Sequence, residues 1–153
     1  MRETKLIALH RKKWLEDNPG DYYHKIADGM GMGGQKPFDV FIWGWRQHGS
    51  GLTREVWAKE FKIHKSHQAF PLKEIKPHQI RELVLAERAG AKSTVFIGVR
   101  FLMDVDTQKR LGLRLRQIHV DIELPIQHIV DLVKEGKKSL KVLPYLLKEI
   151  NGE

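Results

Sequence analysis

The sequence contains no cysteine among its 153 residues. This absence excludes a thiolate nucleophile, a zinc site with cysteine ligands and an iron–sulfur cluster. It also gives no sign of an oxidising compartment, because disulfides are mostly found in secreted and extracellular proteins. We therefore expect a cytoplasmic location, and a core formed by apolar packing from the 41% of residues that are hydrophobic.

Long hydrophobic runs are also missing. The longest apolar stretches, residues 40–45 and 94–99, are far shorter than the roughly 18 to 20 residues that cross a bilayer. The N-terminal segment is charged and amphipathic, unlike a signal peptide. There is no internal repeat and no low-complexity segment. We expect one compact domain over residues 1–153, without a signal peptide or a membrane span.

Basic residues are in excess. Lys and Arg number 27 against 19 Asp and Glu, which gives a formal charge of +8 and a pI near 9.7. Such a balance favours polyanionic partners, of which nucleic acid is the commonest. Ribosome association and a simple solvated surface are alternative explanations. Charge alone therefore indicates a DNA partner and a nucleoid-associated location without deciding between these alternatives.

Hydrophobic periodicity and turn residues predict the order helix, three strands, helix, strand. The predicted elements are a helix at 3–16, strands at 22–27, 38–45 and 55–64, a helix at 77–89 and a strand at 93–102. Between them, 28–34 and 46–53 are predicted as glycine-containing loops and 66–76 as irregular. A helix between two strands permits a right-handed parallel crossover. The expected class is α/β, with a mixed central β-sheet flanked by helices.

The sequence is harder to interpret beyond about residue 103. Leucines alternate with polar residues over 111–115, and this pattern predicts a strand-like segment that carries a basic stripe of Arg110, Arg114 and Arg116. The apolar phase changes before Ile118, which indicates a bulge or turn near 116–117. Helices are predicted at 125–134 and 140–150. We thus expect a core at about 1–103 and a C-terminal β/α extension at about 104–153.

An acidic pattern lies on the predicted hairpin. Asp39 falls in the first hairpin strand, and Glu60 and Lys62 fall in the second. Alternation along a strand puts Glu60 and Lys62 on one face and turns Phe61 to the other. Exposed ion pairing would explain Glu60 and Lys62 equally well. Asp39, however, interrupts an apolar run, where an isolated carboxylate is costly unless a metal or a donor compensates it.

Such a set of side chains suits phosphodiester hydrolysis. Carboxylates can hold one or two Mg²⁺ ions, with Mn²⁺ as a substitute, and the metal lowers the pKa of its bound water. A nearby lysine can orient that water or deprotonate it, and the sequence does not decide which.

The surrounding residues resemble a known family. Pro37-Phe38-Asp39 followed by Glu60-Phe61-Lys62 is similar to the Pro-Asp...(Asp/Glu)-x-Lys signature of the PD-(D/E)XK nucleases. The stretch 60–79, EFKIHKSHQAFPLKEIKPHQ, resembles the RecU-type Holliday-junction resolvases, in which a Phe-Pro-Leu turn leads to a helix that begins with His-Gln. The likeness covers about residues 22–101. It departs from the signature at Phe38, which separates Pro37 from Asp39.

The resemblance implies a restriction-endonuclease-like core and a magnesium-dependent endodeoxyribonuclease that cuts branched DNA, with roles in DNA recombination and repair. It assigns Asp39 and Glu60 as metal ligands, Lys62 as the catalytic lysine and Gln79 as a polar group near the scissile phosphate. Many relatives add a glutamate from the first helix, for which Glu3 is the candidate here. A solvated carboxylate in a first helical turn is the alternative for Glu3. The family also implies a homodimer.

The expected DNA-binding surface lies close in sequence to this site. Glycines let backbone N–H groups approach phosphates, and lysines supply positive charge. The candidates are Gly31, Gly33, Gly34, Lys36, Lys65, Lys73, Lys76 and His78. For each single lysine, a solvated charge is the simpler explanation.

Two other functions fit the sequence. One is a nicking or nonspecific DNase of a phage or mobile element with the same acidic site. The other is a noncatalytic basic module that binds DNA or RNA. Trp43, Trp45 and Trp57 could stack on bases, but their positions on strands favour core or dimer packing.

Overall fold

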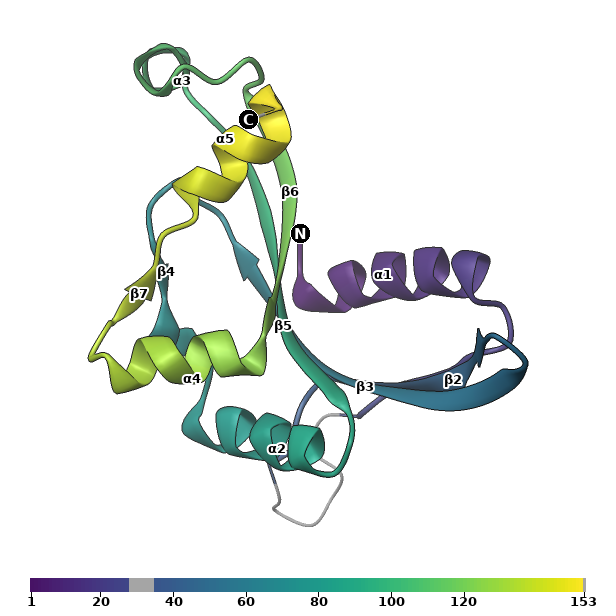
Figure 1. Cartoon of the computed structure of the whole chain (residues 1–153). Helices are drawn as coiled ribbons and strands as arrows, with labels where there is room; N and C mark the ends of the chain where they lie inside the picture. The colour runs from purple at the N-terminus through teal and green to yellow at the C-terminus, as the bar shows by residue number, and fades with distance from the viewer. Residues whose placement is uncertain (28–34, 153) are drawn as a thin grey trace.

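The computed structural model describes residues 1–27 and 35–152, which form an α/β fold around a mixed five-stranded sheet (Figure 1). The strand order is β1-β2-β3-β5-β6, in which only β3 and β5 run parallel. The strands are β1 (Tyr22–Lys25), β2 (Val40–His48), β3 (Gly51–His64), β5 (Lys92–Leu102) and β6 (Gln117–Pro125). The predicted order of helix, three strands, helix and strand is confirmed for the main sheet and its helices, and the structure adds a two-residue strand and a short 3₁₀ helix before α2.

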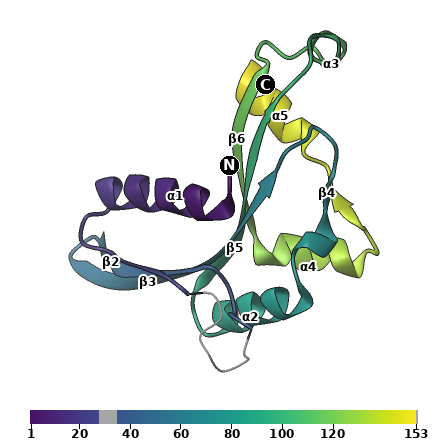
Figure 2. The same ribbon diagram turned by 180° about the vertical axis from the view of Figure 1, so that it is seen from behind.

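The helices lie on both faces of the sheet. In Figures 1 and 2, α1 lies on one side, and α2, α4 and α5 lie on the other. Their bounds are α1 (Glu3–Asp17), α2 (Pro77–Arg88), α4 (Ile126–Lys134) and α5 (Leu143–Asn151). None of the helices within the described residues is long and apolar enough to span a membrane.

Each face has its own core, because alternate residues of every strand point to opposite sides. On the α1 face, Leu6 and Ile7 pack with Ile42, Trp57 and Phe61. The larger core on the opposite face joins α2, α4 and α5 to the sheet; its strand residues include Ala58, Val95, Ile97, Val99, Ile118, Val120 and Ile122. Residues of the predicted extension therefore share a core with residues of the first two thirds of the chain.

The β2–β3 hairpin is longer than the sequence indicated. His48 pairs with Gly51, so only Gly49 and Ser50 make the turn, and Gly49 adopts a left-handed φ of 60°. The prediction of a turn over 46–53 is wrong. The polar residues of this segment belong to the strands because their side chains contact side chains of the neighbouring strand. The Arg54 guanidinium, for example, lies 4.2 Å from the centre of the Trp43 ring.

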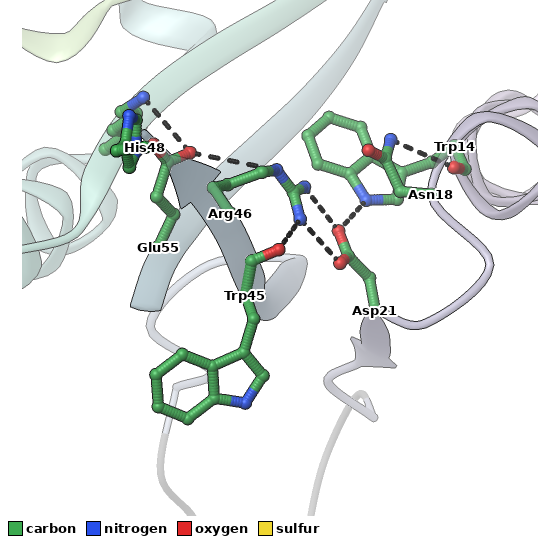
Figure 3. A network of polar contacts seen from close by, with 8 residues as sticks. Trp14, Asn18, Asp21, Trp45, Arg46, His48 and Glu55 are labelled. Carbon is green, nitrogen blue, oxygen red and sulfur yellow. Dashed lines mark hydrogen bonds and ion pairs between the residues drawn. The ribbon is translucent and has the colours of Figure 1, made fainter. Parts of the chain in front are cut away.

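A polar network links the end of α1 to the outer part of the β2–β3 hairpin, residues 44–55, which we call the hairpin arm (Figure 3). Asp21 accepts hydrogen bonds from Arg46 at 2.8 and 2.7 Å and from the Trp14 indole at 2.8 Å. Gly44 makes this possible, since a Cβ at that position would lie 1.9 Å from Asp21 Oδ1. The network holds α1 against the arm.

The segment after β5 differs from the prediction. Residues 105–111 form the helix α3 (Val105–Leu111), which begins where Asp104 accepts a hydrogen bond from the Thr107 N–H and ends at the left-handed Gly112. The predicted strand-like basic stripe is therefore wrong. Arg114 donates to the Ile150 carbonyl and Arg116 to the Met103 carbonyl, so both guanidinium groups hold the chain together.

The irregular segment 66–76 is anchored by a second, two-stranded sheet. Within it, β4 (Phe70–Pro71) pairs with β7 (Ser139–Leu140), and a short 3₁₀ helix, η1 (Leu72–Glu74), follows β4. The Leu72 N–H donates to the Lys138 carbonyl at 2.9 Å. This pairing fixes the path of the chain from the end of β3 to the start of α2.

Candidate functional site

Asp39 lies directly before β2 and beside Glu60 of β3. β2 begins at Val40, which pairs with Lys59, so Asp39 falls just outside the strand that was predicted to start at residue 38. Two hydrogen bonds hold Asp39 against β3: its N–H donates to the Lys59 carbonyl at 3.1 Å, and its carboxylate accepts from the Phe61 N–H. The Asp39 charge raises the pKa of Glu60, so the two carboxyl groups lie within electrostatic range of each other. The bonds to Lys59 and Phe61, on either side of Glu60, thus bring the two carboxyl groups together.

Asp39 is almost fully buried and uses both carboxylate oxygens. Its Oδ2 accepts a hydrogen bond from the Phe61 N–H at 2.8 Å. Its Oδ1 lies 2.6 Å from the Lys36 ammonium group. These partners compensate the burial of this carboxylate, which is 4% exposed.

Glu60 is buried still more deeply, at 1% exposure. Gln79 Nε2 donates to Glu60 Oε1 at 2.8 Å, and Lys62 Nζ lies 3.5 Å from the same oxygen. Gln79 is itself fixed, because its Oε1 accepts from the Lys76 N–H at the start of α2. Glu60 Oε2 is buried and has no hydrogen-bond partner among the described residues.

Burial is the main cause that raises the pKa of Glu60 to about 8, and the neighbouring Asp39 carboxylate raises it further. Lys62 and Lys36 act in the opposite direction. Two carboxyl groups this close disfavour simultaneous ionisation in the absence of a strong positive charge. The pair therefore has the electrostatics of a cation site.

Glu3 borders the same region from the first turn of α1. The residue is exposed, yet partial burial of its carboxyl group raises its pKa. The Lys62 charge lowers this pKa and the Asp39 charge raises it, which shows that Glu3 lies within electrostatic range of both. Glu74 of η1 also contributes, and nothing in the sequence pattern singled it out.

A divalent cation fits part of this arrangement. Hard cations prefer carboxylate oxygens, and the unpaired buried Glu60 Oε2 is an oxygen that such a cation would satisfy. In the described part of the chain, no group of three or more His, Cys, Asp and Glu side chains is arranged to hold a metal. Asp39 and Glu60 would supply two ligands to such a cation, and water would complete the coordination.

The predicted DNA-binding residues are spread around the site. Lys65, Lys73 and Lys76 are exposed, and His78 is half-buried in the first turn of α2. Lys36 contacts Asp39 and thus belongs to the acidic site itself. Gly31, Gly33 and Gly34 lie outside the described residues.

Two cavities lie near this part of the fold. One of about 590 Å³ is bordered by Glu3, Ile63, His64, Lys65 and Glu74, beside the end of β3. Another of about 560 Å³ lies between α1 and the β5–β6 strands, on the sheet face opposite Glu60. The first adjoins the strand segment that carries Glu60 and Lys62, and its exposed rim includes a lysine.

Comparison with known proteins adds nothing to this picture: no protein-family model matches the sequence, and no curated protein is significantly similar to it.

Proposed function

We propose that the chain is a magnesium-dependent DNA endonuclease with a restriction-endonuclease-like core, and that it acts on branched DNA. The observation that carries this proposal is the proximity of Asp39, directly before β2, to Glu60 on β3, with Lys62 beside Glu60. The unpaired, buried Glu60 Oε2 supports a cation at this point. Branched DNA as the preferred substrate, and a homodimer, rest on the resemblance to the RecU-type resolvases.

Each side chain has a role in phosphodiester hydrolysis. Asp39 and Glu60 would hold Mg²⁺, or Mn²⁺ in its place, and that ion would polarise a phosphoryl oxygen and acidify bound water. Gln79 fixes the Glu60 carboxyl by a hydrogen bond at 2.8 Å. Lys62, 13% exposed, holds a positive charge next to Glu60 and within reach of solvent. Its ammonium group would orient the nucleophile or stabilise charge on the phosphate.

The surroundings suit a DNA backbone. The net charge of +8 attracts a polyanion, and Lys65, Lys73 and Lys76 are exposed on the segment that connects β3 to α2. Lysine contacts to phosphates position a duplex without reading its sequence. This composition favours recognition of DNA structure over recognition of bases.

The test is a cleavage assay on a synthetic four-way junction and on linear duplex of the same sequence, with Mg²⁺ and mapped cut positions. We expect paired cuts near the branch point. Asp39→Asn and Lys62→Ala should abolish cutting while both variants still bind the junction in Ca²⁺. Asp106→Asn, an exposed carboxylate of α3, is the charge-matched control and should cut like the unmodified chain.

The same assay separates the alternatives. Equal cutting of junction and linear duplex would identify a nicking or nonspecific DNase with the same site. Full activity of the Asp39→Asn variant would place the active site elsewhere.

A noncatalytic nucleic-acid-binding protein is the second candidate. The Lys36–Asp39 ion pair favours it, because a neutralised carboxylate can be purely structural. This function predicts binding that weakens steeply with salt, and no cleavage at any Mg²⁺ or Mn²⁺ concentration.

A further inference from the structure

Lys36 occupies the position at Asp39 that a cation would need. Its Nζ lies 2.6 Å from Asp39 Oδ1, and the Lys36 side chain is only 20% exposed. Asp39 Oδ2 is already used by the Phe61 N–H. A metal ion that takes Asp39 Oδ1 as a ligand would therefore compete with the Lys36 ammonium group for that oxygen.

Electrostatics makes this competition strong. An ammonium group and a divalent cation on the same carboxylate oxygen would lie a few Å apart and repel each other, in a site where little water screens them. Conversely, with no metal bound, Lys36 and Lys62 are the charges that lower the pKa of Glu60 beside Asp39. The two carboxyl groups need a neighbouring positive charge both with and without a metal. In the metal-free site, Lys36 supplies part of that charge.

We propose that Lys36 is an exchangeable counter-ion: it neutralises Asp39 while no divalent cation is bound, and it moves to the DNA backbone when a cation takes its place. The inference rests on the proposed nuclease function. It differs from a simple DNA-binding role, because the phosphate contact of Lys36 forms only after the metal has bound.

Reciprocal coupling follows from this exchange. If metal binding frees Lys36 for a phosphate, the metal strengthens DNA binding, and DNA strengthens metal binding by the same factor. Lys62 cannot take over the role of Lys36 at Asp39, because its Nζ pairs with a different carboxylate, at 3.5 Å from Glu60.

The first experiment is calorimetric titration of the metal-free chain with Mn²⁺, without DNA. We expect Lys36→Met to bind Mn²⁺ on the order of tenfold more tightly than the unmodified chain, because the competing charge is gone. Lys5→Met, which removes an exposed lysine of α1, should leave the affinity unchanged. Equal or weaker Mn²⁺ binding by Lys36→Met would overturn the proposal, provided that thermal unfolding shows the variant to be folded.

The second experiment measures junction affinity against salt concentration, with and without Ca²⁺. In the unmodified chain, Ca²⁺ should steepen the salt dependence by about one phosphate contact, a slope change of roughly 0.9. In Lys36→Met this increment should vanish. An unchanged increment in the variant would show that Lys36 does not move to the backbone.

These outcomes separate the inference from the nuclease proposal. If Asp39→Asn abolishes Mn²⁺ binding but Lys36→Met does not tighten it, the metal site stands and the exchange fails. If neither the unmodified chain nor Lys36→Met binds Mn²⁺, both proposals fail together.

Discussion

Gln79 donates a hydrogen bond from Nε2 to Glu60 Oε1 at 2.8 Å, while its own Oε1 accepts from the Lys76 N–H. One amide thus joins the start of α2 to a carboxyl group on β3. The orientation of the amide follows from these two partners, because only the nitrogen end can donate to Glu60.

Replacing this amide should impair catalysis more than binding. In Gln79→Leu, Glu60 loses its donor, so its pKa should rise further and the ligand should be less fixed. We expect a fall of about 10- to 100-fold in the junction-cleavage rate and a shift of the acidic limb of the pH–rate profile to higher pH. Junction binding in Ca²⁺ should persist. Gln127→Leu, at an exposed position of α4, is the control, and an unshifted profile in Gln79→Leu would contradict the role given to Gln79.

The buried Glu60 should also make the metal-free chain less stable at alkaline pH. Its pKa is raised from 4.5 to about 8, so the folded chain retains a proton that the unfolded chain releases at lower pH. The free energy of unfolding therefore falls, through Glu60, as the pH rises from about 4.5 to about 8. In EDTA at pH 8.5, Glu60→Gln should be more stable than the unmodified chain, by on the order of 1 kcal/mol, and this gain should disappear near pH 4.5.

Urea unfolding at both pH values measures the Glu60→Gln effect. Glu87→Gln, an exposed glutamate of α2, controls for the loss of one charge. A Glu60→Gln variant that is less stable than the unmodified chain at pH 8.5 would show that Glu60 is ionised and well compensated in the metal-free fold.

The proximity of Glu60 and Lys62 could be anticipated from the sequence because it depends on strand alternation. The hairpin prediction brought Asp39 near them, but Asp39 precedes β2 and is held by hydrogen bonds to the Lys59 carbonyl and the Phe61 N–H. The side chains that pair with these groups could not be anticipated. Residues 35–39 form no regular element in the structure, so the contact between Lys36 and Asp39 follows no periodicity. Lys36 was for that reason predicted only as a DNA-binding residue.

The error over residues 104–116 had a different origin. The alternating leucines at 111, 113 and 115 favour a strand, whereas Asp104 and Gly112 beside them are residues that begin and end helices. The C-terminal helices predicted at 125–134 and 140–150 are present as α4 and α5, but α5 begins only at Leu143, because Ser139 and Leu140 form β7. The pairing of β4 with β7 was missed, since two-residue strands carry too little pattern to be seen.

The arm network predicts a marked effect for a small substitution. In Gly44→Ala, the new Cβ would meet Asp21 Oδ1 at 1.9 Å, so Asp21 must leave Arg46 and Trp14. Breaking this partly buried network should lower the free energy of unfolding by about 2 kcal/mol. In Gly51→Ala, on the same hairpin, the nearest atom is His48 O at 3.7 Å, and stability should change little. Urea unfolding of the two variants compares them, and equal stabilities would show that the network does not hold the arm.

The half-buried His10 predicts acid sensitivity. Burial, with a smaller contribution from Lys59, lowers the pKa of His10 from 6.5 to about 3, and its ring lies among Trp14, Phe61 and Phe96. Below about pH 6.5, His10 binds a proton in the unfolded chain but stays neutral in the folded chain. The free energy of unfolding therefore falls as the pH falls from 6.5 toward 3. In His10→Gln, the stability difference between pH 7 and pH 4 should shrink by on the order of 2 kcal/mol. His128→Gln, at an exposed position of α4, should keep the difference of the unmodified chain. If His10→Gln kept it as well, the acid sensitivity of this fold would have to come from other groups.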